Sequence, residues 1–507
     1  MSLAVVFSRA GVGVESPLVT VEVDLSNGLP CFSIVGLPET TVKESKDRVR
    51  SALLNSQFEF PARRITVNLA PADLPKDGGR FDLAIAIGLL AASEQIPSLH
   101  LIQYEFFGEL ALSGECRSVR GILPAAIQTK NANKILVIPE QNAQEASLVS
   151  GLEILPVQSL LALCAHLTCQ QKIDAFTSEL NKNSNSTLNY SVCLSDVHQQ
   201  HHAKRALEIA AAGGHSLLMV GPPGTGKTML ASRLPSIMPD MTEQEALETA
   251  AIRSINASQE FKLEAWQQRP FRNPHHTASG VALVGGGSQP RPGEISLAHN
   301  GVMFLDELPE FDRKVLEVLR EPLESGSITI SRAARQAEFP ARFQLIAAMN
   351  PCPCGYLGHL NNRCNCTYEQ VERYRSKISG PLLDRIDMHI EVANIASKLL
   401  RQQPSQPQAT SDEIRVRVNR ARNLQLQRSP TPNNQLAVKQ IEQWCCLQAQ
   451  DSRLLEDAIE KLDLSARAYH RILKVARTIA DLDEAENIKT KHLTEAISYR
   501  KLDRRNN

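Results

Sequence analysis

The stretch Gly221-Pro222-Pro223-Gly224-Thr225-Gly226-Lys227-Thr228 follows the apolar run Ser216-Leu-Leu-Met-Val220 and precedes Met229-Leu-Ala-Ser-Arg-Leu234, which is compatible with a helix. It fits the full Walker A pattern in a strand, loop and helix context. Its glycines let backbone amides point at phosphate oxygens, and the following helix directs its positive dipole end at the same anion. We therefore expect all eight residues to bind ATP, with Lys227 reaching the outer phosphates and Thr228 holding Mg²⁺. The alternative is a Gly-Pro turn before a helix.

The composition is that of an ordinary soluble protein. The chain has 507 residues, enough for roughly three domains. Its 55 basic and 55 acidic residues cancel, so any nucleic-acid contact must come from a local patch. The longest apolar run, Leu83 to Ala92, is shorter than the roughly 20 residues that span a bilayer. The N-terminus lacks the basic start and apolar core of a signal peptide, which predicts a cytoplasmic location with no membrane partner.

Residues 1–170 predict an α/β domain. Strands are expected at 19–24, 64–69, 107–112 and 134–139, because apolar and β-branched residues alternate or run together there. Helices are expected at 41–55 and 81–93. The second helix is apolar nearly all round and should be central to the core.

This domain resembles the proteolytic domain of Lon-type proteases, which has a ribosomal S5-type α/β fold. Pro75-Lys-Asp-Gly78 opens the segment that carries the nucleophilic serine in Lon, but this chain has Arg80 there. The lysine of the dyad would fall near Arg120-Gly-Ile-Leu123, at the position of Leu123. With neither dyad member present, we expect a non-catalytic relative with an assembly or interaction role.

A buried apolar strand, Val302 to Leu305, ends in Asp306 and Glu307, which is the Walker B pattern. Asp306 is expected to hold Mg²⁺ and Glu307 to activate the attacking water. A further strand, Phe343 to Met349, ends at Asn350, the position of the polar sensor of the γ-phosphate in AAA+ ATPases. The alternative is an Asn that only satisfies the strand end.

Two arginines beyond the sensor strand resemble catalytic arginines of AAA+ proteins. Gly380-Pro-Leu-Leu-Asp-Arg-Ile-Asp387 is similar to the arginine-finger segment of the magnesium-chelatase and minichromosome-maintenance branch, which gives Arg385 a role in a neighbouring subunit's site. A local pair with Asp384 or Asp387 is the alternative. Arg467 matches the second sensor at the start of a helix, and Arg471 is the fallback.

The gap between Thr228 and Asp306 is longer than the core needs, so a segment is inserted. Residues 272–293 have loop chemistry throughout and suit a protrusion into the channel of a ring. Residues 326–340 predict a β-hairpin with Arg332 and Arg335 at its tip. In related helicases a basic hairpin here tracks the DNA backbone, so these two arginines are candidate DNA contacts. A solvated turn is the alternative.

Two Cys-x-Cys pairs follow the sensor, Cys352 with Cys354 and Cys364 with Cys366, and His359 lies between them. Four thiolates could hold one zinc ion. Zinc knuckles usually have two or more residues between paired cysteines, so buried reduced thiols at the strand end are an equal alternative.

The domain organisation follows from these segments. The predicted order is the Lon-like domain (1–170), a linker (171–196), a P-loop AAA+ α/β core with a Cys-rich insert at 351–366 (197–395), a second linker (396–411) and a C-terminal helical lid (412–507). The lid begins with a helix carrying five arginines, which are a candidate basic face or, equally, the polar side of a solvated helix. These are Arg415, Arg417, Arg420, Arg422 and Arg428.

This order resembles the magnesium chelatase-like family of AAA+ ATPases, also called YifB. The resemblance implies a homo-hexameric DNA helicase that uses ATP and Mg²⁺ to drive branch migration of single-stranded or branched DNA in homologous recombination and natural transformation. The residues themselves support a ring-forming ATPase. The alternatives are a magnesium-chelatase-type motor subunit, for which the chain lacks an integrin-like partner domain, and a non-proteolytic protein-remodelling ATPase.

Overall fold

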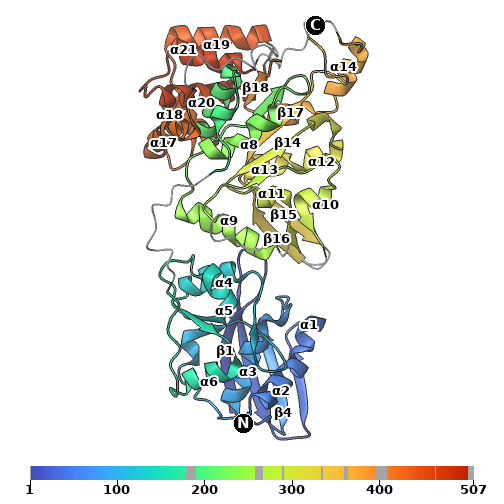
Figure 1. Ribbon diagram of the computed structural model, residues 1–507, viewed down its shortest axis with the longest axis vertical. Coiled ribbons are helices and arrows are strands. Elements are labelled where there is room, and N and C mark those ends of the chain that lie inside the picture. The colour runs from blue at the N-terminus through green and yellow to red at the C-terminus, as the bar shows by residue number, and fades with distance from the viewer. Residues whose placement is uncertain are drawn as a thin grey trace. The chain divides into compact units, whose positions relative to one another are not determined.

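The computed structural model describes residues 2–177, 190–256, 266–287, 290–332, 335–358, 363–394, 408–462 and 464–500; the side chains of residues 2, 40, 331, 332, 335 and 336 lie outside the description. The chain forms two compact units (Figure 1). The first comprises Met1–Thr187, Ala246–Trp266 and Ser331–Phe339, and the second Leu188–Glu245, Gln267–Ile330 and Pro340–Asn507. Within the described ranges, no helix has the length and apolar character needed to cross a bilayer.

The first unit contains a four-stranded sheet in the order β1 (Ser2–Arg9), β2 (Leu18–Ser26), β4 (Arg64–Ala70) and β3 (Cys31–Val35). β2 is antiparallel to both neighbours, and β3 is parallel to β4. Buried and half-buried residues alternate along β2 and β4, which confirms the strands predicted there.

Two of the first unit's helices were predicted from the sequence. The expected helix at 41–55 forms α1 (Thr40–Lys43) and α2 (Ser45–Asn55). Helix α3 (Asp82–Ala92) is buried along its entire length, as its apolar sequence predicted. A Cβ on Gly88 would lie only 2.7 Å from Cγ2 of Val23, so α3 packs directly on the sheet.

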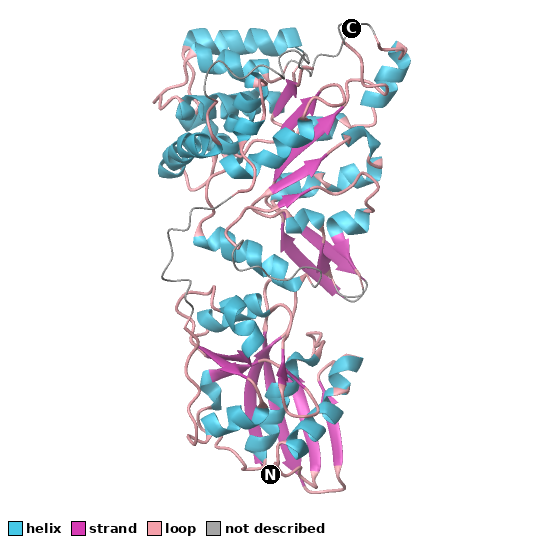
Figure 2. Ribbon diagram, viewed as in Figure 1, coloured by secondary structure: helices cyan, strands magenta, loops and turns pink. Residues whose placement is uncertain are grey.

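A second, parallel sheet of this unit consists of β5 (Tyr104–Phe106), β8 (Ile135–Pro139) and β9 (Ile154–Val157). Helices α4 (Ile122–Asn131) and α5 (Glu140–Ala146) precede β8 and β9, and both of them and α6 (Leu160–Leu167), which follows β9, contact these two strands; Figure 2 shows helices beside the strands of this unit. The single strand predicted at 107–112 is wrong. The Gly108 amide donates to the carbonyl of Arg80, and only β6 (Glu109–Leu110) pairs, with β7 (Cys116–Arg117).

The second unit is built on a five-stranded parallel sheet in the order β11 (Phe271–Arg272), β14 (Val302–Leu305), β17 (Gln344–Met349), β10 (Leu217–Val220) and β18 (Met388–Glu391). All pairings in this sheet are parallel. Strands β14 and β17 are buried at every position, as expected of parallel strands covered on both faces. The α/β core predicted around the Walker A stretch is confirmed.

Helices α7 (His201–Gly213) and α8 (Lys227–Ile237) pack on this sheet. The C-terminal helices are α17 (Ser411–Arg428), α18 (Val438–Trp444), α19 (Ala449–Leu462), α20 (Ala466–Leu482) and α21 (Thr490–Ser498). Their apolar faces share one hydrophobic cluster with α7 and the sheet. The predicted helical C-terminal region is therefore present and packs against the core.

The described parts of the segment between the two Walker motifs contain more helix and strand than the sequence predicted. Helix α9 (Glu243–Ile255) carries Ala250 and Ala251 into the hydrophobic cluster of the first unit that includes Ile122 and Leu123. The 272–293 stretch, predicted to be loop throughout, contains helix α10 (Gly280–Val284), which the Ser279 side chain caps. The prediction missed this cap.

The same stretch also contains a two-stranded ribbon of β12 (Gly285–Gly286) and β13 (Arg291–Pro292). A Cβ on Gly285 would lie 2.1 Å from the carbonyl oxygen of Arg291, so only glycine allows this ribbon to close. The hairpin predicted at 326–340 is confirmed as β15 (Ser327–Arg332) and β16 (Arg335–Pro340).

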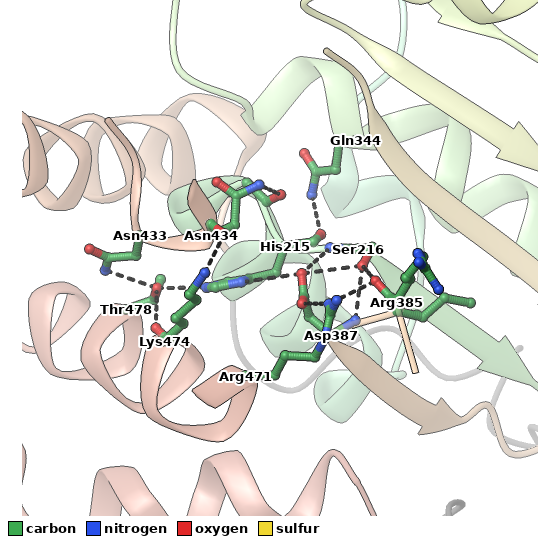
Figure 3. Close-up of polar contacts among 12 residues, drawn as sticks. His215, Ser216, Gln344, Arg385, Asp387, Asn433, Asn434, Arg471, Lys474 and Thr478 are labelled. Atoms are coloured by element: carbon green, nitrogen blue, oxygen red, sulfur yellow. Dashed lines mark hydrogen bonds and ion pairs between the residues drawn. The ribbon is translucent and has the colours of Figure 1, made fainter. Parts of the chain in front are cut away.

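A buried carboxylate joins the helical region to the sheet (Figure 3). Asp387, just before β18, accepts hydrogen bonds from the backbone N–H and hydroxyl of Ser216 at 3.0 and 3.2 Å, and it forms an ion pair with Arg471 of α20. His215 lies 3.5 Å from the same carboxylate, and its other ring nitrogen is 2.7 Å from the Thr478 hydroxyl of α20. Asp387 therefore connects the start of β10 to the lid.

The charge of Asp387 is maintained although the side chain is buried. Burial alone would raise its pKa, but Arg471, His215 and the Ser216 amide lower it more, so the pKa lies well below its usual range. A carboxyl group with a lowered pKa stabilises the fold above about pH 4, its value in the unfolded chain, and this contribution is lost as the pH falls through the folded value.

We expect Asp387→Ala to lower the melting temperature of the protein by at least about 5 °C at pH 7, because it leaves the partly buried Arg471 without its carboxylate, at a cost of about 3 kcal/mol. Differential scanning calorimetry measures this change. Glu484→Gln is the control, since its pair with Arg420 is about two-thirds exposed at both ends and should contribute little. Equal melting temperatures for the two variants would contradict the role given to Asp387.

Candidate nucleotide-binding and ATPase site

Three predicted motifs meet at one edge of the parallel sheet. Strand β10 leads into Gly221, β14 into Asp306 and β17 into Asn350, and these strands are adjacent in the order β14, β17, β10. Val220 is paired with Met349, and the Gly221 amide donates to the Met349 carbonyl at 3.1 Å. Because all three strands are parallel, their carboxyl ends gather the motifs into one site.

The Walker A loop has the backbone that an anion site needs. Gly224 and Gly226 have φ of +78° and +84°, which only glycine adopts without strain. A Cβ at either position would meet no heavy atom within 4 Å, so the constraint is conformational rather than steric. Helix α8 starts at Lys227 directly after this turn, and its N-terminal amides face the loop.

Lys227 is directed across the loop. Its Nζ donates to the carbonyl oxygens of Gly221 and Pro222 at 2.7 and 2.9 Å and to Oδ1 of Asn350 at 3.2 Å. Burial lowers the pKa of Lys227, and the carboxylates of Asp306 and Glu307 oppose this shift. The ammonium group and Asn350 thus lie where a triphosphate on the loop would present its outer phosphates.

Two oxygen ligands suitable for Mg²⁺ lie together. The Thr228 hydroxyl donates to Oδ2 of Asp306 at 2.7 Å, and Oδ1 of Asp306 accepts the Glu307 amide at 3.0 Å. A hydroxyl and a carboxylate beside phosphate oxygens are the ligand set of Mg²⁺ in P-loop proteins. These residues fit the ion that the sequence predicted.

Glu307 has a left-handed backbone conformation with φ of +53°, and its side chain is half exposed. Its Oε2 lies 3.2 Å from Nδ1 of His276, whose ring meets Phe311 edge-on. The sequence reasoning missed His276, because it assigned the whole 272–293 stretch to a channel protrusion. The available signal was the His275-His276 pair shortly after a strand adjacent to the Walker B strand.

The candidate finger, Arg385, is buried. Its Nη1 donates to the Pro381 carbonyl at 2.7 Å, and its Nη2 lies 2.5 Å from Oε1 of Glu324. The partner is therefore Glu324 and not one of the two neighbouring aspartates considered from the sequence. Arg467 is largely exposed and lies 3.8 Å from the same Glu324 oxygen.

Arg471, the fallback for the second sensor, is bound to Asp387 and to the backbone carbonyl of Arg385 (Figure 3). Its guanidinium therefore serves the connection between the lid and the sheet.

Arg385 and the Walker A loop lie at opposite ends of the sheet. β18 pairs with β10 so that Met388 faces Leu217 and Glu391 faces Val220. Arg385 precedes Met388, whereas the loop follows Val220. The four residues of β10, which rise by roughly 10 Å, lie between these two ends.

The four cysteines gather in one cluster. Their sulfur atoms lie within 4.8 Å of one another, with distances from Cys352 of 3.3 Å to Cys354 and 3.7 Å to Cys364. The Tyr356 amide is the main cause of a lowered pKa at Cys354. The cluster could bind zinc. His359, considered as a substitute ligand, lies outside the described residues.

The candidate DNA contacts Arg332 and Arg335 lie in β15 and β16, and their side chains are outside the description. The five arginines of α17 do not form one free basic face, because four of them have partners within the protein. Arg417 pairs with Glu208, Arg428 with Asp481 and Arg415 with Asp412, and Arg422 donates to two carbonyls of α7.

The two positions that correspond to the Lon dyad have structural contacts. The Arg80 guanidinium donates to the backbone carbonyls of Arg9 and Arg120, and Leu123 is fully buried in a hydrophobic cluster.

A parallel sheet that joins Walker A and Walker B motifs and a polar sensor at its carboxyl edge defines an AAA-type P-loop nucleotide-binding protein. The chain matches the families described as "Magnesium chelatase, subunit ChlI" over residues 193–400, "Subunit ChlI of Mg-chelatase" over 21–142 and "Magnesium chelatase, subunit ChlI C-terminal" over 408–500. It belongs to the magnesium chelatase ChlI family, whose membership suggests ATPase activity with ATP and Mg²⁺.

Three relatives match nearly the full length. The chain is 54% identical to the competence protein ComM of Haemophilus influenzae, with 99% of this chain and 98% of the relative covered. It is 50% identical to YifB of Salmonella typhimurium and 49% to YifB of Escherichia coli, with the same shares covered.

We expect Glu307→Gln to lower kcat for ATP hydrolysis about 100-fold or more while leaving nucleotide affinity unchanged, because the amide cannot accept a proton from water. His276→Ala should lower kcat severalfold, because His276 orients the Glu307 carboxylate. Steady-state ATPase assays and titration with a fluorescent ATP analogue separate the two parameters.

The control for this pair is His201→Ala, since His201 is exposed at the start of α7 and should leave both parameters unchanged. A rise in kcat for His276→Ala would show that His276 restrains Glu307 rather than orienting it for reaction.

Proposed function

We propose that this chain is the subunit of a homo-hexameric, Mg²⁺-dependent ATPase ring that acts as a DNA helicase and drives branch migration. The observation that carries the ring is the position of Arg385. Its side chain begins at the amino edge of the sheet, and the Walker A loop lies at the carboxyl edge. Arg385 therefore suits a neighbouring subunit's phosphates better than its own, which requires an oligomer with a head-to-tail interface.

Arg467 fits the same proposal. It shares the carboxylate of Glu324 with Arg385, so both guanidinium groups lie on one face of the subunit. In a ring, phosphate oxygens of the adjoining site would compete with Glu324 for both arginines. Arg385 would act as the finger and Arg467 as the second sensor.

Two observations support DNA as the substrate. The hairpin β15–β16 carries an arginine at the turn end of each strand, at 332 and 335, and single-stranded DNA is tracked by basic groups along its phosphates. The relative of 54% identity is a competence protein, and competence is the uptake of DNA for recombination. We therefore propose single-stranded or branched DNA as the partner, in natural transformation and homologous recombination.

The first unit has a separate role in this proposal. We propose that it is a Lon-like domain without proteolytic activity, since Arg80 and Leu123 occupy the positions of the dyad and are used for carbonyl contacts and core packing. In this proposal the unit acts in the assembly of the ring or in binding another molecule.

A second candidate function is a metal-chelatase motor. The family descriptions that match the chain name subunits of magnesium chelatase. Such a motor would use the same ATPase site but would act on a partner protein instead of DNA.

Strand displacement tests the proposed helicase. Purified wild-type protein with ATP and Mg²⁺ should displace a strand from forked or three-stranded DNA, and Lys227→Ala should not, because it lacks the ammonium that reaches the outer phosphates.

The double variant Arg332→Ala/Arg335→Ala should keep basal ATPase activity but lose displacement. Arg453→Ala, an exposed arginine on α19, is its control. ATP hydrolysis with neither displacement nor stimulation by DNA would overturn the helicase and favour the chelatase-type or protein-remodelling motor.

Mixing subunits tests the shared site. Arg385→Ala and Lys227→Ala should each be inactive alone, but an equal mixture should recover ATPase activity. About one quarter of the interfaces in randomly mixed rings would combine an intact loop with an intact arginine. Circular dichroism checks that Arg385→Ala is folded. Failure of recovery at concentrations where light scattering shows mixed rings would contradict action across the interface.

A further inference from the structure

The cysteine cluster, defined as Cys352, Cys354, Cys364 and Cys366, has the geometry of a mononuclear metal site. Four thiolates around one zinc ion, with bonds of about 2.3 Å, lie about 3.8 Å apart at the corners of a tetrahedron. The observed separations of 3.3, 3.6 and 3.7 Å are close to this value and too long for disulfides. In an iron–sulfur cluster the four thiolates bind two or four iron atoms, so some of them lie farther apart than the 4.8 Å within which all four sulfur atoms lie here, and this geometry favours a single ion.

Backbone amides support thiolates at this cluster. The Leu357 amide donates to Sγ of Cys352 at 3.3 Å. The Tyr356 amide donates to Cys354. Amide donors that point at ligand sulfurs are the usual outer shell of tetrahedral thiolate sites, because they spread the negative charge of the bound thiolates.

The cluster adjoins the nucleotide site. Cys352 follows Asn350 by two residues, and Asn350 accepts a hydrogen bond from Lys227. Gly355, in the turn after the first cysteine pair, is buried with φ of +83°. A Cβ on Gly355 would lie 2.7 Å from Cδ of Pro223, so its backbone rests on the Walker A loop.

The second cysteine pair leads into α14 (Tyr368–Arg375), which contacts the same turn. The backbone N–H of Asn350 donates to the Tyr374 hydroxyl. The Arg375 guanidinium donates to the Pro351 carbonyl at 3.5 Å. An ion held by all four cysteines would therefore join the end of β17 to the start of α14 and fix the turn between Asn350 and Gly355.

We propose that the cysteine cluster is a structural zinc site that positions Asn350 and the Walker A loop for nucleotide binding. This inference rests on the proposed nucleotide site but not on DNA as the substrate. Zinc acts here by holding the end of β17 and the start of α14 together, which restricts the position of Asn350 and Gly355 before nucleotide binds.

The test starts with metal content. Full-length protein, purified under reducing conditions without chelator or added metal, should contain about one zinc per chain by mass spectrometry, because four thiolates form one closed site. Cys364→Ser should lose the zinc, and the exposed Cys446→Ser should retain it. Protein without zinc, or with iron in its place, would overturn the proposal.

Nucleotide affinity tests the coupling. Cys364→Ser should bind a fluorescent ATP analogue with Mg²⁺ roughly tenfold more weakly than wild type, because a small displacement of binding groups has a large effect. Gly355→Ala should retain zinc but also lose affinity, because its Cβ would displace Pro223. Unchanged affinity in a zinc-free Cys364→Ser protein would overturn the coupling.

If Cys364→Ser does not fold, wild-type protein provides the same comparison. Zinc is released with a mercurial reagent and measured with a chromogenic chelator, the thiols are regenerated with a reductant, and nucleotide affinity is measured with and without added zinc. Recovery of affinity only with zinc supports the proposal, and recovery without it overturns the proposal. Since no DNA is present in these assays, a failure of the helicase experiment would leave their outcome unaffected.

Discussion

The parallel pairing of β10 with β17 and of β17 with β14 is the constraint on which the nucleotide site depends. Parallel strands place their carboxyl ends on one edge, so the loops that follow Val220, Leu305 and Met349 meet although they are far apart in the sequence. Strands β14 and β17 are buried at every position and β10 at all but Val220, so their side chains pack closely on both faces of the sheet, and a change of register would disrupt this packing. The Walker A, Walker B and sensor residues can act together only because this register brings them to the same edge of the sheet.

At the opposite edge of the same sheet, paired carboxylates hold the helical lid in place. Asp387 binds the start of β10 and Arg471 of α20. Asp481, on the same helix, binds Arg428 and Arg477. Buried carboxylates are costly unless paired, so each of them defines the arrangement of the helices around it. This explains why Arg428 of α17 is an internal partner and not part of a basic surface.

The cysteine turn shows how an insert can affect a site without contributing a catalytic group. The backbone of Gly355 packs against the ring of Pro223, and Asn350 lies directly before the turn. In our proposal, a change in the conformation of this turn would therefore also affect the Walker A loop. The hairpin β15–β16 precedes the sensor strand, and its Ile330 side chain packs against the β12–β13 ribbon at Gly285.

The sequence by itself determined the Walker A loop, the Walker B acids, Asn350, the arginine hairpin and strands β2, β4, β8, β10, β14 and β17, because these depend on local spacing and on apolar periodicity. It could not show that Glu324 faces Arg385, that His276 faces Glu307, or that Gly355 lies on Pro223. These partners are separated by between 31 and 132 residues along the chain. Only the packing of helices and loops on the parallel sheet brings them together, since contacts between distant segments are set by tertiary structure and not by local pattern.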